Sequence, residues 1–175
     1  MYEFHGRQTR KCGGAPYITH LVAVAGLAGE YGGSEEQFIA ALLHDAVEDQ
    51  GGHGALQRIR GEFGEAVADL VWACTDAWEH PKPAWRARKE AHLARIPGAP
   101  IDARLVLAAD KLHNLQSMLR TYTHDEAYWR QFNAGREGTL WYYDAMGDAL
   151  QEGWEHAILA ELDSARRRFR ALLEE

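Results

Sequence analysis

ALLHDAVEDQ, residues 41–50, places one histidine and three acids directly behind an apolar helical run. At about 100° per residue on a helical wheel, the four polar side chains share one arc and the apolar side chains occupy the other. The polar residues are His44, Asp45, Glu48 and Asp49. For the stretch alone, a solvated face at the end of a helix is the simplest interpretation. Its function therefore depends on the partners that other segments supply.

The length and composition are those of an ordinary folded protein. The 175 residues are 46% hydrophobic and 26% charged, which predicts a single domain, residues 1–175, with a sizeable core. The two cysteines, Cys12 and Cys74, lie far apart in the sequence. We therefore expect no disulfide framework and no thiolate metal site, and a reducing, cytoplasmic location fits best. Neither a signal segment nor a membrane-spanning run is expected.

The net charge limits the possible partners. A formal charge of −7 argues against nucleic acid, because proteins that bind nucleic acids present a basic face. The charge is compatible with a phosphorylated small molecule, provided that local cations or a metal ion offset it. The sequence leaves the oligomeric state open.

Helical periodicity dominates the chain and strand signals are scarce, which predicts an all-α fold. Ser34, followed by acids and a glutamine, is a typical helix N-cap. Prolines and pairs of glycines mark the turns. We expect helices at 17–31, 35–48, 54–60, 64–78, 84–95, 101–121, 133–151 and 155–173, and a further helix within the first ten residues.

Two further polar residues lie within apolar helical segments. His20 lies on an apolar stripe, where a lone histidine is more often a core residue than a ligand. Asp110 interrupts the run LVLAA, and a buried carboxylate without a partner would be costly. Taken with His44 and Asp45, they make two histidines and two aspartates in three apolar helices. Mixed imidazole and carboxylate ligands suit a divalent transition metal such as manganese, iron, cobalt or zinc.

The pattern His20, His44-Asp45, Asp110 resembles the H…HD…D signature of the HD-domain metal-dependent phosphohydrolases. HDAVED and ADKLHN are more particularly similar to motifs in the hydrolase domain of the RelA/SpoT alarmone enzymes and in the small stand-alone metazoan SpoT homologs. The likeness runs from RKCGGAPYITH through FGEAVADLV to Asn114. It implies a helical HD-domain fold and one metal ion, usually manganese, bound by these four residues.

The resemblance also implies roles for residues beside the metal. Glu48 and Asp49 would position or activate the attacking water. Asn114 would contact the substrate near the ribose and its phosphate. A carboxylate one turn beyond a ligand on the same helix can reach toward water at the metal, which agrees with these roles.

By the same resemblance, Arg10 and Lys11 would lie near the nucleotide base and phosphates. Without it, the basic run RQTRK would be interpreted as a solvated N-terminus. The aromatic segment 141–143 offers Tyr143 as a candidate for stacking on a nucleotide. Core packing is the more frequent use of such residues.

The remaining histidines carry weaker signals. His113 points away from Asp110 on the helical wheel, so we do not expect it to be a ligand. Other histidines are expected at the surface or in loops, namely His53, His80, His92 and His124.

The chain departs from the alarmone hydrolases at two positions near these motifs. Leu107 stands where those enzymes commonly have lysine, and Gln50 where they usually have threonine. Both changes leave the metal set intact and bear on the choice of substrate.

The expected substrate is guanosine 3′,5′-bispyrophosphate, cleaved at the 3′ position to release pyrophosphate. One alternative is a phosphatase acting on another 2′- or 3′-phosphorylated nucleotide, including NADPH. Another is a nucleotide-binding module without turnover. The Glu48-Asp49 pair argues against that module, because binding alone needs no water-activating acids.

Overall fold

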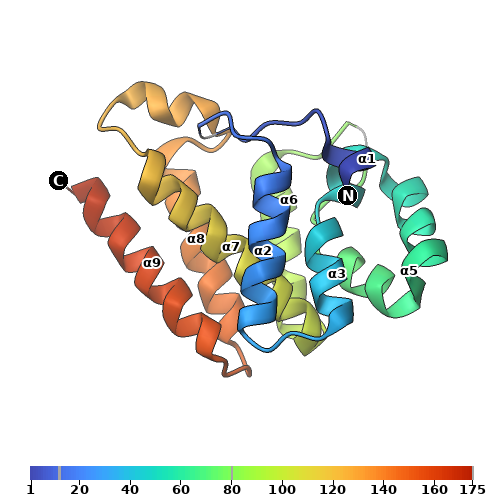
Figure 1. Ribbon diagram of the computed structural model, residues 1–175. Coiled ribbons are helices and arrows are strands. Elements are labelled where there is room, and N and C mark those ends of the chain that lie inside the picture. The colour runs from blue at the N-terminus through green and yellow to red at the C-terminus, as the bar shows by residue number, and fades with distance from the viewer. Residues whose placement is uncertain (12, 80, 175) are drawn as a thin grey trace.

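All the regular elements of residues 1–11, 13–79 and 81–174, which the computed structural model describes, are helices (Figure 1). Cys12, His80 and the side chain of Gln50 lie outside the described part. The α-helices are α1 Tyr2–His5, α2 Ile18–Glu30, α3 Glu35–Leu43, α4 Ala46–Gln50, α5 Gly52–Cys74, α6 Trp85–Arg95, α7 Ile101–Thr121, α8 Gly135–Gln151 and α9 Ala157–Glu174. Two 3-10 segments are η1 Ile96–Gly98 and η2 Glu126–Gln131. The predicted all-α class is confirmed.

Helix α7 occupies the middle of the core. It packs against α2, α3, α5, α8 and α9, and most of its residues between Ala103 and Met118 are buried. In Figure 1, α9 and α5 lie at opposite ends of the molecule, and α2 and α3 run side by side between them. An aspartate on α7, such as Asp110, is therefore placed at the centre of the fold.

Most of the predicted helices are found with ends within two residues of the expected ones. The capping box at the start of α3 is also present: the Ser34 hydroxyl accepts from the Gln37 amide N–H at 3.3 Å, and the Gln37 side chain accepts from the Ser34 amide N–H at 2.8 Å. The break expected between the segments 54–60 and 64–78 is also present: α5 consists of two helical parts joined across a kink at Gly64, where φ is 88°, and it ends at Cys74 rather than at residue 78. Only glycine adopts such an angle at little cost.

The predicted helix 35–48 is wrong in one respect that matters for the site. Helix α3 ends at Leu43, and α4 begins at Ala46, after a turn at His44 and Asp45. The cause is local, because the His44 ring nitrogen Nδ1 lies 2.7 Å from the Ala41 carbonyl oxygen. In a continuous helix that oxygen would accept from the amide of Asp45. The four polar groups therefore project from a turn and a following short helix.

No helix in the described part of the chain is both long and apolar enough to cross a membrane.

Candidate active site

Four polar side chains from separate segments converge beside α7. His20 lies on α2, His44 and Asp45 form the turn after α3, and Asp110 lies on α7. The Nε2 atom of His20 lies 3.2 Å from Asp110 Oδ1 and 3.7 Å from Asp45 Oδ2. The Nε2 atom of His44 lies 3.0 Å from Asp45 Oδ2 and 3.7 Å from Asp110 Oδ1. The fold thus brings together the four residues that the sequence predicted as a set.

The donor atoms of this cluster suit a divalent transition metal. His20, His44 and Asp45 can each present one ligand atom, and these atoms lie within 4.8 Å of one another. His44 Nε2 is buried and, although it lies 3.0 Å from Asp45 Oδ2, it makes no hydrogen bond of good geometry among the described residues. Because its other ring nitrogen is engaged with Ala41, Nε2 is left facing two carboxylates. An imidazole nitrogen held in this way is ready to bind a cation.

The charges within the cluster compensate one another. Burial alone lowers the pKa of His44, but the charges of Asp45 and Asp110 outweigh it and hold that pKa well above its ordinary value. Burial raises the pKa of Asp110, but Lys111, followed by His20 and His44, lowers it well below the usual range. His44 therefore holds a proton more firmly than an ordinary histidine, whereas Asp110 stays ionised. A metal ion must displace the proton of His44, so metal binding is expected to weaken at low pH.

Two side chains that the sequence interpretation did not use orient the ligands. His113 Nδ1 lies 2.8 Å from His20 Nδ1, so it fixes the ring whose Nε2 faces the aspartates. A helical wheel compares positions on one helix only, so it could not show this contact between α7 and α2. Tyr17 donates its hydroxyl to Asp45 Oδ2 at 2.5 Å and lies three residues before His20. Such outer contacts fix the direction in which a metal ligand points.

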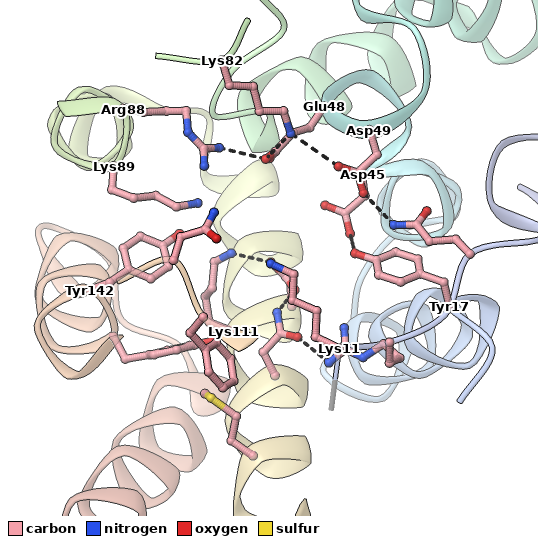
Figure 2. Close-up of a pocket in the computed structure, with 18 of the residues that line it drawn as sticks. Lys11, Tyr17, Asp45, Glu48, Asp49, Lys82, Arg88, Lys89, Lys111 and Tyr142 are labelled. Carbon is pink, nitrogen blue, oxygen red and sulfur yellow. Dashed lines mark hydrogen bonds and ion pairs between the residues drawn. The ribbon is translucent and has the colours of Figure 1, made fainter. Parts of the chain in front are cut away.

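A cavity of about 450 Å³ opens onto this cluster (Figure 2). Its wall includes Asp45 and Asp110, whereas His20 and His44 are buried behind them. The remaining predicted site residues also line it: Arg10, Lys11, Glu48, Asp49, Asn114 and Tyr143. Segments far apart in the sequence therefore share one cavity: Arg10 Nη2 lies 2.7 Å from Asn114 Oδ1, although the two residues are 104 positions apart.

The cavity is richer in cations than the sequence interpretation expected. Besides Arg10 and Lys11, its cationic lining residues are Lys82, Arg88, Lys89 and Lys111. These cations outnumber the four lining carboxylates, although the whole chain has a net charge of −7. A positive cavity in an acidic protein favours an anionic ligand such as a phosphorylated nucleotide. Two features of the sequence could have indicated these cations. Lys111 directly follows the predicted ligand Asp110, and α6 contains several basic residues.

Glu48 and Asp49 lie on α4 at one wall of the cavity, as Figure 2 shows. Glu48 Oε1 lies 3.0 Å from Lys82 Nζ and 2.9 Å from Arg88 Nη1. Asp49 Oδ2 accepts a hydrogen bond from the side-chain amide of Gln8 at 2.9 Å. Burial, followed by the charge of Asp76, raises the pKa of Glu48 to about 7, although Lys89 lowers it in part. At neutral pH this carboxylate is a stronger base than an ordinary glutamate.

Two expectations about neighbouring residues change. Leu107 is only 2% exposed and packs in the core, so this departure from the alarmone hydrolases does not alter the cavity wall. His92 was expected at the surface or in a loop, but it is 2% exposed, on the inner side of α6. Its buried position could not be recognised from the sequence, because α6 contains many charged residues. Burial, followed by the charge of Lys111, lowers the pKa of His92 to about 3.

The aromatic segment contributes more than the predicted Tyr143. Tyr142 also lines the cavity, is 6% exposed, and lies with its ring 4.7 Å from Lys89 Nζ. Trp141 packs instead beneath the guanidinium of Arg86, 3.2 Å from the ring centroid. The segment therefore divides between the cavity wall and packing between α6 and α8.

The fold and the cluster define the class of protein. The family model described as HD domain matches residues 1–139, so the chain belongs to the HD domain family.

Its relatives indicate the branch of the family. The chain is 37% identical over 119 residues to guanosine-3′,5′-bis(diphosphate) 3′-pyrophosphohydrolase MESH1 from Homo sapiens, covering 66% of this chain and 64% of that protein. It is 36% identical over 120 residues to a probable guanosine-3′,5′-bis(diphosphate) 3′-pyrophosphohydrolase from Synechocystis, covering 67% of this chain and 15% of that protein. The chain thus spans less than two thirds of the length of these curated relatives.

A solved structure extends the likeness beyond the motifs. It is described as a metazoan ortholog of SpoT that hydrolyses ppGpp and plays a role in starvation responses. The match has a TM-score of 0.77 at 25% identity, and covers 98% of this chain and 91% of the other. The resemblance predicted from HDAVED and ADKLHN is confirmed.

Proposed function

We propose that this protein is a metal-dependent phosphohydrolase that cleaves guanosine 3′,5′-bispyrophosphate at the 3′ position and releases pyrophosphate. The observation that carries the proposal is the cavity, where a metal-binding type of cluster, an acidic pair and six cationic side chains face one space. A substrate with a diphosphate at each end needs such cations. The names of the relatives support the same reaction.

In this proposal His20, His44, Asp45 and Asp110 hold one divalent ion, which the family likeness suggests is manganese. A bound ion supplies Lewis acidity toward a phosphate oxygen and toward water. His113 and Tyr17 would hold His20 and Asp45 in place, because His113 contacts Nδ1 of His20 and Tyr17 donates a hydrogen bond to Oδ2 of Asp45.

The remaining chemistry falls to side chains of the cavity wall. Glu48 accepts a proton from the attacking water, and Asp49 orients that water. Arg10, Lys11 and Asn114 bind the nucleotide, and Tyr143 packs against it. Because Arg10 and Asn114 already contact each other at 2.7 Å, this part of the binding surface is organised before substrate arrives.

A panel of nucleotides tests the substrate. Guanosine 3′,5′-bispyrophosphate with manganese is expected to yield guanosine diphosphate and pyrophosphate in equal amounts. The alternative phosphatase would instead release single phosphate from NADPH and no pyrophosphate from the guanosine compound. Tight binding without any product would identify a binding module. Product analysis by ion-exchange chromatography separates these three outcomes.

The pH dependence of turnover tests the role of Glu48. The carboxylate accepts a proton only when it is ionised, and its pKa is raised to about 7 by burial and by Asp76. The maximal rate should therefore rise with pH through neutrality, and fall about tenfold between pH 8 and pH 6. Metal content is measured at each pH, so that loss of metal is not mistaken for protonation. A rate independent of pH over this range, with metal bound, would contradict the assignment.

A further inference from the structure

Asp76 is a buried carboxylate that lies behind the cavity wall rather than on it. It follows the C-terminus of α5, and its side chain is 2% exposed. The preceding residue is fixed by its side chain and its backbone: the Thr75 hydroxyl donates to the Val71 carbonyl at 2.9 Å, and Arg95 donates to the Thr75 carbonyl at 2.9 Å. The position of Asp76 is therefore set by the scaffold, independently of any ligand.

Asp76 holds two of the cations that line the cavity. Its Oδ1 atom lies 2.5 Å from Arg88 Nη1, and its Oδ2 atom accepts from Lys89 Nζ. The side chains of Arg88 and Lys89 are 9% and 14% exposed, so both cations sit at the edge of the interior. Long cationic side chains at such a position need a fixed partner to keep one orientation.

The same guanidinium atom connects Asp76 to the acidic pair. Arg88 Nη1 lies 2.9 Å from Glu48 Oε1 as well as 2.5 Å from Asp76 Oδ1. Figure 2 shows Arg88 and Lys82 both reaching Glu48, Arg88 from α6 and Lys82 from the loop before it. Asp76 thus acts on Glu48 both directly, by its charge and a side-chain hydrogen bond, and through the shared Arg88, while it stays outside the lining of the cavity.

The charge around Glu48 depends on Asp76. Three cations face Glu48 from the loop before α6 and from α6 itself, namely Lys82, Arg88 and Lys89. Asp45, Asp49 and Asp76 supply the nearby negative charge. Without Asp76, the α6 cations would be less neutralised and would bind the Glu48 carboxylate more strongly. A carboxylate held in that way is a weaker base.

We propose that Asp76 is a positioning residue of this site, which fixes Arg88 and Lys89 against the cavity and limits their charge so that Glu48 stays able to accept a proton. The part concerning Glu48 rests on the proposed hydrolase function. The alternative is that Asp76 only stabilises the packing of α6. In that case, removing Asp76 would change the catalytic rate by the same factor with or without Glu48.

Binding of inorganic pyrophosphate tests the effect on charge. Asp76→Asn keeps the shape of the side chain and adds one net positive charge beside Arg88 and Lys89. The metal-loaded variant should therefore bind pyrophosphate more tightly than the wild-type protein, on the order of fivefold to tenfold, by titration calorimetry. A residue important only for packing would leave this affinity unchanged or weaken it. Either of those results in a folded, metal-loaded variant would overturn the proposal.

A double-mutant cycle with Glu48→Gln tests the path through Glu48. Asp76→Asn alone should lower the catalytic rate at least about tenfold, but should cause little further loss in the Glu48→Gln background. If the wild-type protein hydrolyses its substrate but the rate losses of the two single variants multiply in the double variant, the proposal is overturned. If the wild-type protein hydrolyses no nucleotide of the panel, the proposed function fails, and the role of Asp76 toward Glu48 fails with it.

Two further variants control for charge and folding. Glu90→Gln removes one negative charge from α6 at a position where the carboxylate is 54% exposed and pairs with Arg86, and it should leave pyrophosphate affinity within about twofold. Arg88→Lys keeps the charge but removes the guanidinium atom Nη1 that contacts both Asp76 and Glu48. If Asp76→Asn does not fold, Arg88→Lys carries the test. Its loss of rate should not add to that of Glu48→Gln, and an additive loss would overturn the proposal.

Discussion

His44→Ala is expected to abolish metal binding and to lower turnover roughly 10⁴-fold or more. His44 is the residue whose free Nε2 atom is buried between two carboxylates, at 3.0 Å from Asp45 and 3.7 Å from Asp110. Its removal leaves those carboxylates facing each other across the vacated space, without the neutral nitrogen that a transition metal prefers. Elemental analysis of the purified variant, compared with about one metal ion per wild-type chain, measures the loss.

His53→Ala is the matched control for that experiment. His53 is exposed and stacks on Trp72 at 5.4 Å, away from the cluster, so its loss should leave metal content and turnover unchanged. Asp110→Ala provides a second test from a different helix and should also lose the metal. Full metal content in both His44→Ala and Asp110→Ala would show that the four residues are not the ligands.

Glu48→Gln and Asp49→Asn are expected to retain the metal and to lose turnover by roughly 10² to 10⁴ each. Each change preserves the size of the side chain and removes its ability to accept a proton. The loss should appear in the catalytic rate rather than in nucleotide affinity, because the missing interaction forms in the transition state. Single-turnover rates and metal content measured on the same preparation separate catalysis from metal binding.

For these two acids the control is again Glu90→Gln, which changes an exposed carboxylate outside the cavity. The salt bridges of Glu48 with Lys82 and Arg88 make a change in stability expected as well, so unfolding temperatures accompany the kinetics. Parental rates in both Glu48→Gln and Asp49→Asn would mean that the pair is only a solvated helix face. The mechanism proposed for the cavity would then be wrong.

Most of the fold could be predicted because its helices are amphipathic and end at recognisable signals. Helix α7 is found at 101–121 as predicted, and α3 begins with the predicted Ser34 cap. The break at His44 and Asp45 could not be predicted from periodicity, because a side chain replaces a backbone group at the Ala41 carbonyl. The kink at Gly64, by contrast, lies at the predicted boundary between the segments 54–60 and 64–78.

The central residues of the site could be predicted because they interrupt apolar segments, where burying a polar side chain is costly unless it has a partner. The residues that were missed have no such signature. Lys82, Arg88 and Lys89 belong to a polar segment, and only the fold shows that they turn toward α4. Asp76 follows a helix end and would pass for a surface acid in the sequence, yet its side chain is 2% exposed.

Hydrolysis in ¹⁸O-labelled water tests the central claim most directly. If water activated beside Glu48 attacks the phosphorus attached to the 3′ oxygen, the bond from that phosphorus to the 3′ oxygen breaks. The metal-loaded protein acting on guanosine 3′,5′-bispyrophosphate should then place one labelled oxygen in pyrophosphate and none in guanosine diphosphate, as read by mass spectrometry. Label in guanosine diphosphate, release of single phosphate, or no product at all from metal-saturated protein would contradict the account.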